Sequence, residues 1–203
     1  MQVYRIPYST NVERVALAAG HKGVEIDWVD VDPADRSEVE RISGQPLVPV
    51  LVEDGRVVVD STEILRYLEA RRPDPPLFPT EPARRAELDI FLDWFNRVWK
   101  RPPNEIEAER SNEAPDQERI AALGGELTAA LDLFEGLLDG RGFLFGEFSA
   151  ADCAVFPFLK YALLHDARDT EDFHMILREF QPLDDGHARL TDWIRRVNER
   201  PRA

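Results

Sequence analysis

Two polar side chains, Ser9 and Asn11, lie where an apolar segment runs into a predicted helix. The unpaired amides and the macrodipole at a helix N-terminus favour an anion, and a thiolate also needs hydrogen-bond donors. Ser9 could donate its hydroxyl proton to a bound sulfur, and Asn11 could donate from its side-chain amide. Lowering a thiol pKa from about 8.5–9 to about 6.5 takes roughly 3 kcal/mol, which one or two donors and the dipole can supply. The simpler interpretation is that both side chains only cap the helix.

Two later segments carry groups suited to a peptide ligand. Pro49 opens a predicted strand, and a cis Val48–Pro49 bond would expose the backbone amide and carbonyl of Val48 for strand-like hydrogen bonds. Asp60 and Ser61 open a predicted helix, whose free amides and Ser61 hydroxyl suit a carboxylate, while Asp60 could pair with an ammonium group. The alternatives are an ordinary trans proline and a simple helix cap. Together with Ser9, these segments indicate a thiol-binding site.

The elements that must position these residues form a small α/β unit. Short β-branched runs alternate with helical patterns from residue 2 to about residue 77, in the order βαβαββα. The predicted elements are a strand at 3–6, a helix from 12 to 20–23, a strand at 25–31, a helix at 33–42, a hairpin of 48–52 and 57–59, and a helix at 61–72.

A proline-rich segment separates this unit from a helical second half. Residues 72–82 contain five prolines, which lack the amide donor and clash inside helices, so 73–83 is interpreted as a linker between domains 1–78 and 84–203. The second domain is predicted to be all-helical. Its predicted helices span 83–99, 116–138, 149–165, 170–180 and 186–200, and we expect 104–118 to be an irregular, acidic, solvated loop.

The composition excludes several classes of function. The 203 residues are 43% apolar, and 39 acidic against 25 basic residues give a formal charge of −14. This charge repels a phosphate backbone, so nucleic acid is not an expected partner. The single cysteine, Cys153, is expected to be buried and inert, and no cluster has the spacing of a zinc site. Without a long apolar run or a cleavable leader, we expect a cytoplasmic protein with no membrane partner and no metal.

The order and spacing of these motifs resemble the glutathione transferase superfamily along essentially the whole chain. The matching pieces are the strand that runs into Ser9, the Val48–Pro49 pair, and the segment that begins at Asp60–Ser61. A fourth piece is Ser149-x-x-Asp152, a capping box before an apolar run. The resemblance implies a thioredoxin-like α/β N-terminal domain, an all-α helical C-terminal bundle, and glutathione as co-substrate.

The resemblance also implies roles for particular residues. Ser9 would stabilise the thiolate, the Val48 backbone would bind the cysteine of glutathione beside Pro49, and Asp60 and Ser61 would hold the γ-glutamyl end. Asn11 would share the sulfur, as in the bacterial nu-like pattern, and the absence of cysteine at position 9 argues against disulfide exchange. Two further site residues are Gln45, which is displaced by two positions from its usual place before the valine, and Tyr8, which is a rival hydroxyl donor to Ser9.

For the helical domain, the resemblance implies an electrophile pocket and a homodimer. The candidate pocket residues are Phe95, Trp99 and Tyr161, although an aromatic stripe at helical spacing is also typical of a core. The implied reaction is attack of the glutathione thiolate on a small electrophile, as in detoxification, and an isomerase or a peroxidase would use the same site. The alternative is a non-catalytic binding or interaction module of the same fold.

Overall fold

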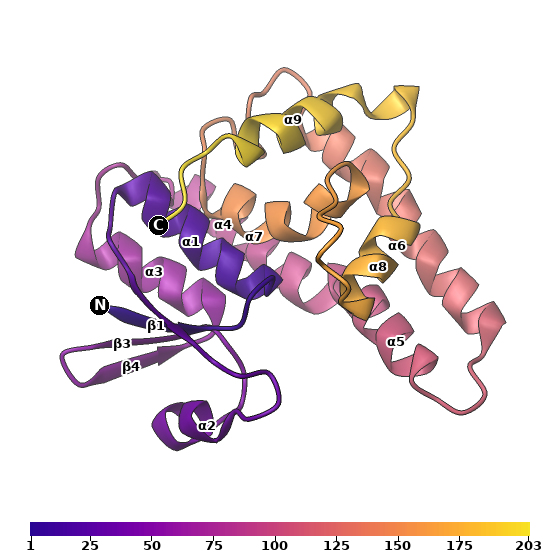
Figure 1. Ribbon diagram of the computed structural model, residues 1–203. Coiled ribbons are helices and arrows are strands. Elements are labelled where there is room, and N and C mark those ends of the chain that lie inside the picture. The colour runs from indigo at the N-terminus through magenta and orange to yellow at the C-terminus, as the bar shows by residue number, and fades with distance from the viewer. The chain divides into compact units, whose positions relative to one another are not determined.

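The computed structural model describes residues 1–203 and divides into two compact units. The first unit comprises Met1–Glu81 together with Arg200–Ala203, and the second comprises Pro82–Glu199 (Figure 1). The division therefore falls within the predicted linker. The last four residues were expected to belong to the helical domain, but they pack with the first unit.

A four-stranded mixed sheet forms the centre of the first unit, with the strand order β2-β1-β3-β4. β1 pairs with β2 in parallel and with β3 in antiparallel orientation, and β3 pairs with β4 as an antiparallel hairpin. In the ladders, Tyr4 of β1 faces Val50 of β3, which in turn faces Val59 of β4. The strands are β1 (Gln2–Arg5), β2 (Asp27–Asp30), β3 (Val50–Glu53) and β4 (Arg56–Val59).

Three helices cover the sheet: α1 (Thr10–Lys22), α2 (Ser37–Ser43) and α3 (Ser61–Arg71). Helices α1 and α3 pack against each other on one side of the sheet, and α2 lies on the other side (Figure 1). Because strand side chains alternate between faces, Tyr4 and Val50 share a core cluster with Val39 of α2. The predicted order βαβαββα and the thioredoxin-like fold are confirmed.

A buried lysine ties the proline-rich segment to α1. The side chain of Lys22 is fully buried, and its ammonium lies 2.6 Å from a carboxylate oxygen of Glu69. The same group donates hydrogen bonds to the carbonyls of Arg72 (2.6 Å) and Pro75 (2.9 Å). Three acceptors therefore satisfy the three donors of the ammonium, as burial of a charge requires.

The second unit is entirely helical, as predicted, and none of the helices is long and apolar enough to cross a membrane. Its helices are α4 (Pro82–Trp94), the π-helical η1 (Phe95–Trp99), α5 (Arg101–Arg110), α6 (Gln117–Leu137), α7 (Ala150–Leu159), the 3₁₀ turn η2 (Lys160–Ala162), α8 (Asp172–Glu179), the 3₁₀ turn η3 (Asp185–His187) and α9 (Ala188–Asn198).

Helix α5 corrects the expectation of an irregular loop at 104–118. Pro102 and Pro103 occupy the first turn of this helix, where a missing amide proton costs nothing. Ion pairs then hold α5 to the following helix, with Glu105 lying 3.2 Å from Arg119. Within 104–118, only residues 111–116 lie outside the helices.

The capping box predicted at Ser149 and Asp152 is present at the start of α7. The fully buried Asp152 carboxylate accepts hydrogen bonds from the Ser149 amide (2.9 Å) and hydroxyl (3.1 Å). It also accepts from the Leu144 amide (3.1 Å) and the Trp193 indole (2.8 Å). One side chain thus joins the start of α7, the preceding loop and α9.

Candidate functional site

The three polar segments picked out in the sequence meet at one edge of the sheet. Ser9 follows the C-terminal end of β1, and Val48 precedes the N-terminal end of β3. Because β1 and β3 are antiparallel, these two ends are neighbours. Asp60 follows the end of β4, whose Val59 pairs with Val50 at the beginning of β3. Strand register alone therefore brings the three segments together.

Ser9 is the N-cap of α1. Its hydroxyl oxygen accepts a hydrogen bond from the Val12 amide at 3.4 Å, and its own amide donates to the Ile6 carbonyl at 3.3 Å. Because the oxygen acts as an acceptor in the cap, the hydroxyl proton remains able to donate to another group. Ser9 and Asn11, which lies in the first turn of α1, are both half-buried. The capping interpretation and the donor interpretation are thus compatible.

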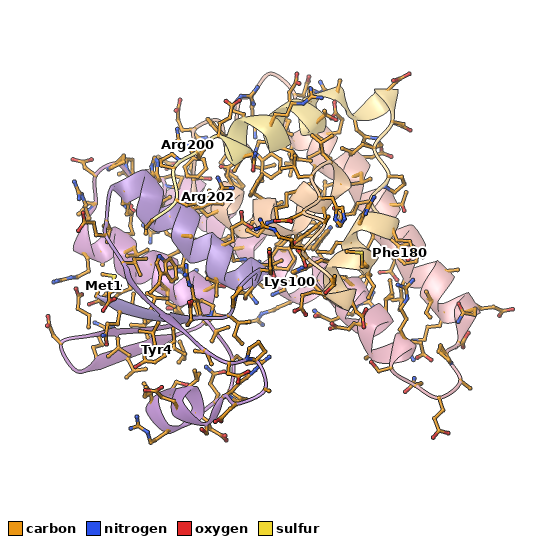
Figure 2. All side chains as sticks on the ribbon, in the orientation of Figure 1. Met1, Tyr4, Lys100, Phe180, Arg200 and Arg202 are labelled. Carbon is orange, nitrogen blue, oxygen red and sulfur yellow. The ribbon has the colours of Figure 1, made fainter.

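Tyr8, the rival donor, has an unusual backbone. Its φ is +64°, and its side chain is 41% exposed. A tyrosine seldom adopts the left-handed region, and residues held there cluster at functional sites. Tyr4, by contrast, is buried in the core cluster on the α2 side of the sheet (Figure 2). Strand alternation therefore turns Tyr4 away from α1.

Val48 presents unpaired backbone groups beside a cis peptide bond. The Val48–Pro49 bond is cis, and the half-buried Val48 side chain packs against the core cluster that includes Val50. The amide and carbonyl of Val48 make no hydrogen bond within the chain. A strand end whose polar groups lack partners can accept another extended chain.

Gln45 is engaged within its own loop. Its side-chain carbonyl accepts from the Leu47 amide at 2.7 Å, and its side-chain nitrogen donates to the Leu47 carbonyl at 2.9 Å. The side chain of Leu47 is 63% exposed. Both polar ends of the Gln45 side chain thus shape the loop before Val48, and any contact of Gln45 with a ligand stays a prediction.

Asp60 is the N-cap of α3, again with a left-handed φ, of +69°. Its Oδ1 accepts from the amides of Thr62 (2.7 Å) and Glu63 (3.3 Å), and its Oδ2 accepts no hydrogen bond within the chain. This finding revises the expectation of free amides at the helix start, because Asp60 already occupies two of them. Ser61 keeps an amide with no acceptor in the chain.

The hydroxyl oxygen of Ser61 accepts a hydrogen bond from a buried arginine. Ser61 is 4% exposed, Arg14 of α1 is 1% exposed, and the Arg14 Nη1 donates to the Ser61 Oγ at 3.2 Å. Sequence reasoning missed Arg14. The helical spacing could have indicated its burial. Arg14 lies three positions before Leu17 and four before Ala18, so it shares the helix face that these apolar residues bury.

The spacing of the strands sets the distance between the two ends of this edge. Neighbouring strands lie about 4.8 Å apart, so the ends of β1 and β4, which are separated by β3, are about 10 Å apart. An extended chain spans about 3.3–3.6 Å per residue, or about 10 Å for three residues. A ligand with a sulfur near Ser9 and an amino-acid end near Asp60 would therefore need to hold these two groups about 10 Å apart.

The predicted pocket residues Phe95, Trp99 and Tyr161 lie in the core of the helical unit. Phe95 is fully buried and Trp99 is 4% exposed, and their rings stack with centroids 4.6 Å apart. Tyr161 is 4% exposed, and its hydroxyl donates a hydrogen bond to the Asp169 carboxylate at 2.8 Å. The same carboxylate lies 2.8 Å from Nδ1 of His174. Their burial is typical of core side chains, and contact with a ligand stays a prediction.

Other chemically active side chains do not gather into a second centre. Cys153 is fully buried in α7, as expected, and no group of three histidine, cysteine or acidic side chains is placed to hold a metal ion. The Tyr161–Asp169–His174 network was not foreseen, because its members come from three consecutive segments without a recognisable spacing.

Comparisons with family models identify both halves of the chain. Residues 3–76 match the N-terminal domain of glutathione S-transferase, and residues 117–196 match its C-terminal domain. The chain belongs to the glutathione S-transferase superfamily. The N-terminal match contains all three segments of the sheet edge, so in this family member the candidate site lies wholly inside the matched domain.

The relatives of this family member carry different names. A stringent starvation protein A homolog of Pasteurella multocida is 29% identical over 147 residues, which cover 72% of this chain and 67% of that one. The Caenorhabditis elegans protein named "Probable maleylacetoacetate isomerase" is 37% identical over 76 residues, which cover 36% of each chain.

Solved structures show the same fold along nearly the whole chain. The tau class glutathione S-transferase of mango has a TM-score of 0.80 at 18% identity and covers 98% of this chain and 89% of its own. A glutathione S-transferase of Rhodospirillum rubrum has a TM-score of 0.75 at 25% identity, with coverages of 98% and 88%.

Proposed function

We propose that this protein is a glutathione transferase that binds glutathione along the sheet edge and stabilises its thiolate with Ser9. The observation that supports this most strongly is the convergence of Ser9, Val48 and Asp60 on one edge of the sheet.

In this proposal each segment binds one part of glutathione. The unpaired amide and carbonyl of Val48 bond the cysteine residue as a short strand would, beside the cis Pro49. The free Oδ2 of Asp60 accepts the γ-glutamyl ammonium, and the amide and hydroxyl of Ser61 donate to the adjoining carboxylate. Ser9 donates to the sulfur, and Asn11 or Tyr8 supplies a second donor.

The proposed reaction needs no metal. The cysteine thiol of glutathione loses its proton to solvent, and Ser9 and the N-terminus of α1 stabilise the thiolate. The thiolate attacks an electrophilic carbon and forms a carbon–sulfur bond, while a leaving group departs with its bonding electrons or, in an addition to a conjugated double bond, the neighbouring carbon takes a proton from solvent. Glutathione-dependent isomerisation or peroxide reduction would begin with the same thiolate. We also propose a homodimer and a cytoplasmic location, as is usual for this family.

A second candidate is a non-catalytic interaction module of the same fold. It is favoured by the similarity to stringent starvation protein A homologs, which extends over 72% of the chain. Calorimetric titration with glutathione separates the two candidates, because only the transferase needs the tripeptide. Absence of heat at millimolar glutathione would refute the transferase proposal for this thiol.

The role of Ser9 is tested by Ser9→Ala in a conjugation assay with a model electrophile. Loss of one hydrogen bond to the thiolate should lower kcat/KM about 10- to 100-fold, or about 1.4–2.7 kcal/mol, with nearly unchanged glutathione affinity. The ultraviolet absorbance of bound thiolate should titrate at higher pH in the variant.

Two further variants keep this test interpretable. Ser9→Gly retains a good N-cap, so its loss of activity cannot come from helix fraying, whereas Ala at the cap costs about 1 kcal/mol. Tyr8→Phe tests the rival donor, and its loss of activity should be smaller than that of the two Ser9 variants. If Tyr8→Phe loses the activity and the Ser9 variants keep it, the assignment of the thiolate donor to Ser9 is wrong.

A further inference from the structure

Residues 200–203 lie along one side of α1 (Figure 2). The Ala203 amide donates to the Ala16 carbonyl at 3.1 Å, and the guanidinium of Arg202 lies 3.0 Å from the Glu13 carboxylate. A Cβ at Gly20 would lie 2.2 Å from a backbone oxygen of this segment, so the glycine permits the close approach. Because positions 13, 16 and 20 share one helix face, the segment follows α1 for about two turns.

His21 binds Arg200, the first residue of this segment. The Nη2 of Arg200 lies 2.7 Å from Nδ1 of His21, and Nε2 of His21 lies 3.3 Å from the Pro76 carbonyl oxygen. Because a guanidinium only donates and a carbonyl only accepts, Nδ1 must carry the lone pair and Nε2 must carry the proton. One tautomer of the neutral imidazole satisfies both contacts. The observed arrangement therefore requires His21 to be uncharged.

A proton on Nδ1 of His21 would break this arrangement. It would turn the acceptor into a second donor that faces Arg200, and two cations would then lie within hydrogen-bond distance. Partial burial is the largest cause that lowers the pKa of His21 below its usual value of 6.5. Arg200 and Lys22 lower this pKa further, whereas the Pro76 carbonyl and Glu69 raise it and only partly offset the other effects.

We propose that residues 200–203 form a pH-sensitive strap on α1, which is docked while His21 is neutral and is released when His21 takes up a proton. Release would remove the contact of Arg202 with Glu13, which lies in the first turn of α1, after the Ser9 cap. The inference goes beyond the proposed function, because the strap needs no thiol.

Linkage gives the sign and the size of the effect. A group whose docked pKa is lowered stabilises docking in full above its undocked pKa, here about 6.5, and this contribution is lost as pH falls. One proton limits the weakening of docking to about 10-fold between pH 7.5 and pH 5.5, and we expect at least about threefold. His21 is the only one of the four histidines in the first unit, and carboxylates ordinarily titrate near pH 4, below this range.

Amide hydrogen exchange of the full-length protein, followed by NMR at pH 7.5 and pH 5.5, measures docking. The protection factor of the Ala203 amide is one probe, and that of the Trp28 indole N–H, which donates to the Ala203 carbonyl at 3.1 Å, is a second. In wild type, both protection factors should fall about 3- to 10-fold on acidification. Amides in the middle of α1 should keep their protection, which shows that the helix itself stays folded.

Three variants assign the effect to His21. His21→Asn places a carbonyl oxygen near the former Nδ1 and cannot take up a proton, so the strap should stay docked at both pH values. His21→Lys carries a charge throughout this range and should lower the Ala203 protection factor already at pH 7.5. His165→Asn removes an exposed histidine of the second unit and should leave the wild-type pH dependence unchanged.

Two results would overturn the proposal. One is a wild-type protein whose Ala203 and Trp28 protection factors are the same at both pH values, and the other is a folded His21→Asn variant that keeps the wild-type pH dependence. Should His21→Asn not fold, Arg200→Met decides. It removes both the bond and the like charge, so the pKa of His21 should rise and the remaining docking should no longer depend on pH, whereas an unchanged pH dependence would refute the strap.

Discussion

Removal of the Asp152 side chain should be among the most damaging single substitutions in the helical unit. The carboxylate accepts four hydrogen bonds and is fully buried, so Asp152→Ala leaves the amides of Leu144 and Ser149 and the indole of Trp193 without acceptors. Each unpaired buried donor costs about 1–3 kcal/mol, and relaxation lowers the sum, so we expect a loss of about 3–5 kcal/mol. This is a large part of the stability of about 5–15 kcal/mol that is typical of a domain.

The isosteric substitution Asp152→Asn should destabilise the protein less than Asp152→Ala does. If the new amide nitrogen replaces Oδ2, the Ser149 hydroxyl can turn to accept from it, and only the Ser149 amide faces another donor. If the nitrogen replaces Oδ1, it faces both the Leu144 amide and the Trp193 indole. The first orientation is therefore preferred, and the expected loss is about 2 kcal/mol.

Urea unfolding and amide hydrogen exchange measure these effects. The exposed Asp192→Asn in α9 is the control and should change the unfolding free energy by less than about 0.5 kcal/mol. The exchange of the Leu144 and Ser149 amides should accelerate in both Asp152 variants. A loss below about 1 kcal/mol for Asp152→Ala, with unchanged exchange at these two amides, would show that the network does not stabilise the unit as reasoned.

Two other predictions follow from close contacts and from charge. In Gly20→Ala the new Cβ would lie 2.2 Å from the carbonyl oxygen of Pro201, so the C-terminal residues should leave α1, the Ala203 amide should exchange faster, and stability should fall by about 1–3 kcal/mol. Burial alone would raise the pKa of Asp169, but hydrogen bonds from His174 and Tyr161 outweigh it and hold the pKa below the usual value. Because the folded pKa is lowered, the stability that Asp169 contributes is present above about pH 3.9 and is lost as pH falls toward the folded pKa. Acid titration of the unfolding free energy should therefore show a smaller loss in Asp169→Asn than in wild type.

Local signals explain what the sequence could predict. The caps at Ser9, Asp60 and Ser149 were foreseeable, because each of these side chains bonds a backbone amide two or three residues ahead. Alternating β-branched runs likewise indicated the order of strands and helices. The π-helical turn was not foreseeable, because its bond from the Lys100 amide to the Phe95 carbonyl has no sequence signature beside the prolines that follow.

Contacts between residues far apart in the chain could not be read from the sequence. The bond from Arg14 to Ser61 spans 47 positions, and the bond from the Trp28 indole to the Ala203 carbonyl spans 175. Figure 2 shows Arg200 and Arg202 beside α1, where Arg202 donates to Glu13 at 3.0 Å. Such pairings form only in the folded chain, and no local sequence pattern predicts them.

The register of the central ladder links the stability of the first unit to its proposed chemistry. Tyr4 faces Val50 on the α2 side of the sheet, so a slip of one residue between β1 and β3 would move the whole apolar set to the opposite face. The same slip would displace Val48 relative to Ser9, because Ser9 follows β1 and Val48 precedes β3 by only a few residues. Burial of the core therefore holds the sheet in the one register that assembles the edge. A binding site built in this way needs few dedicated contacts of its own, and the exception is the buried connection between α1 and α3 that Arg14 provides.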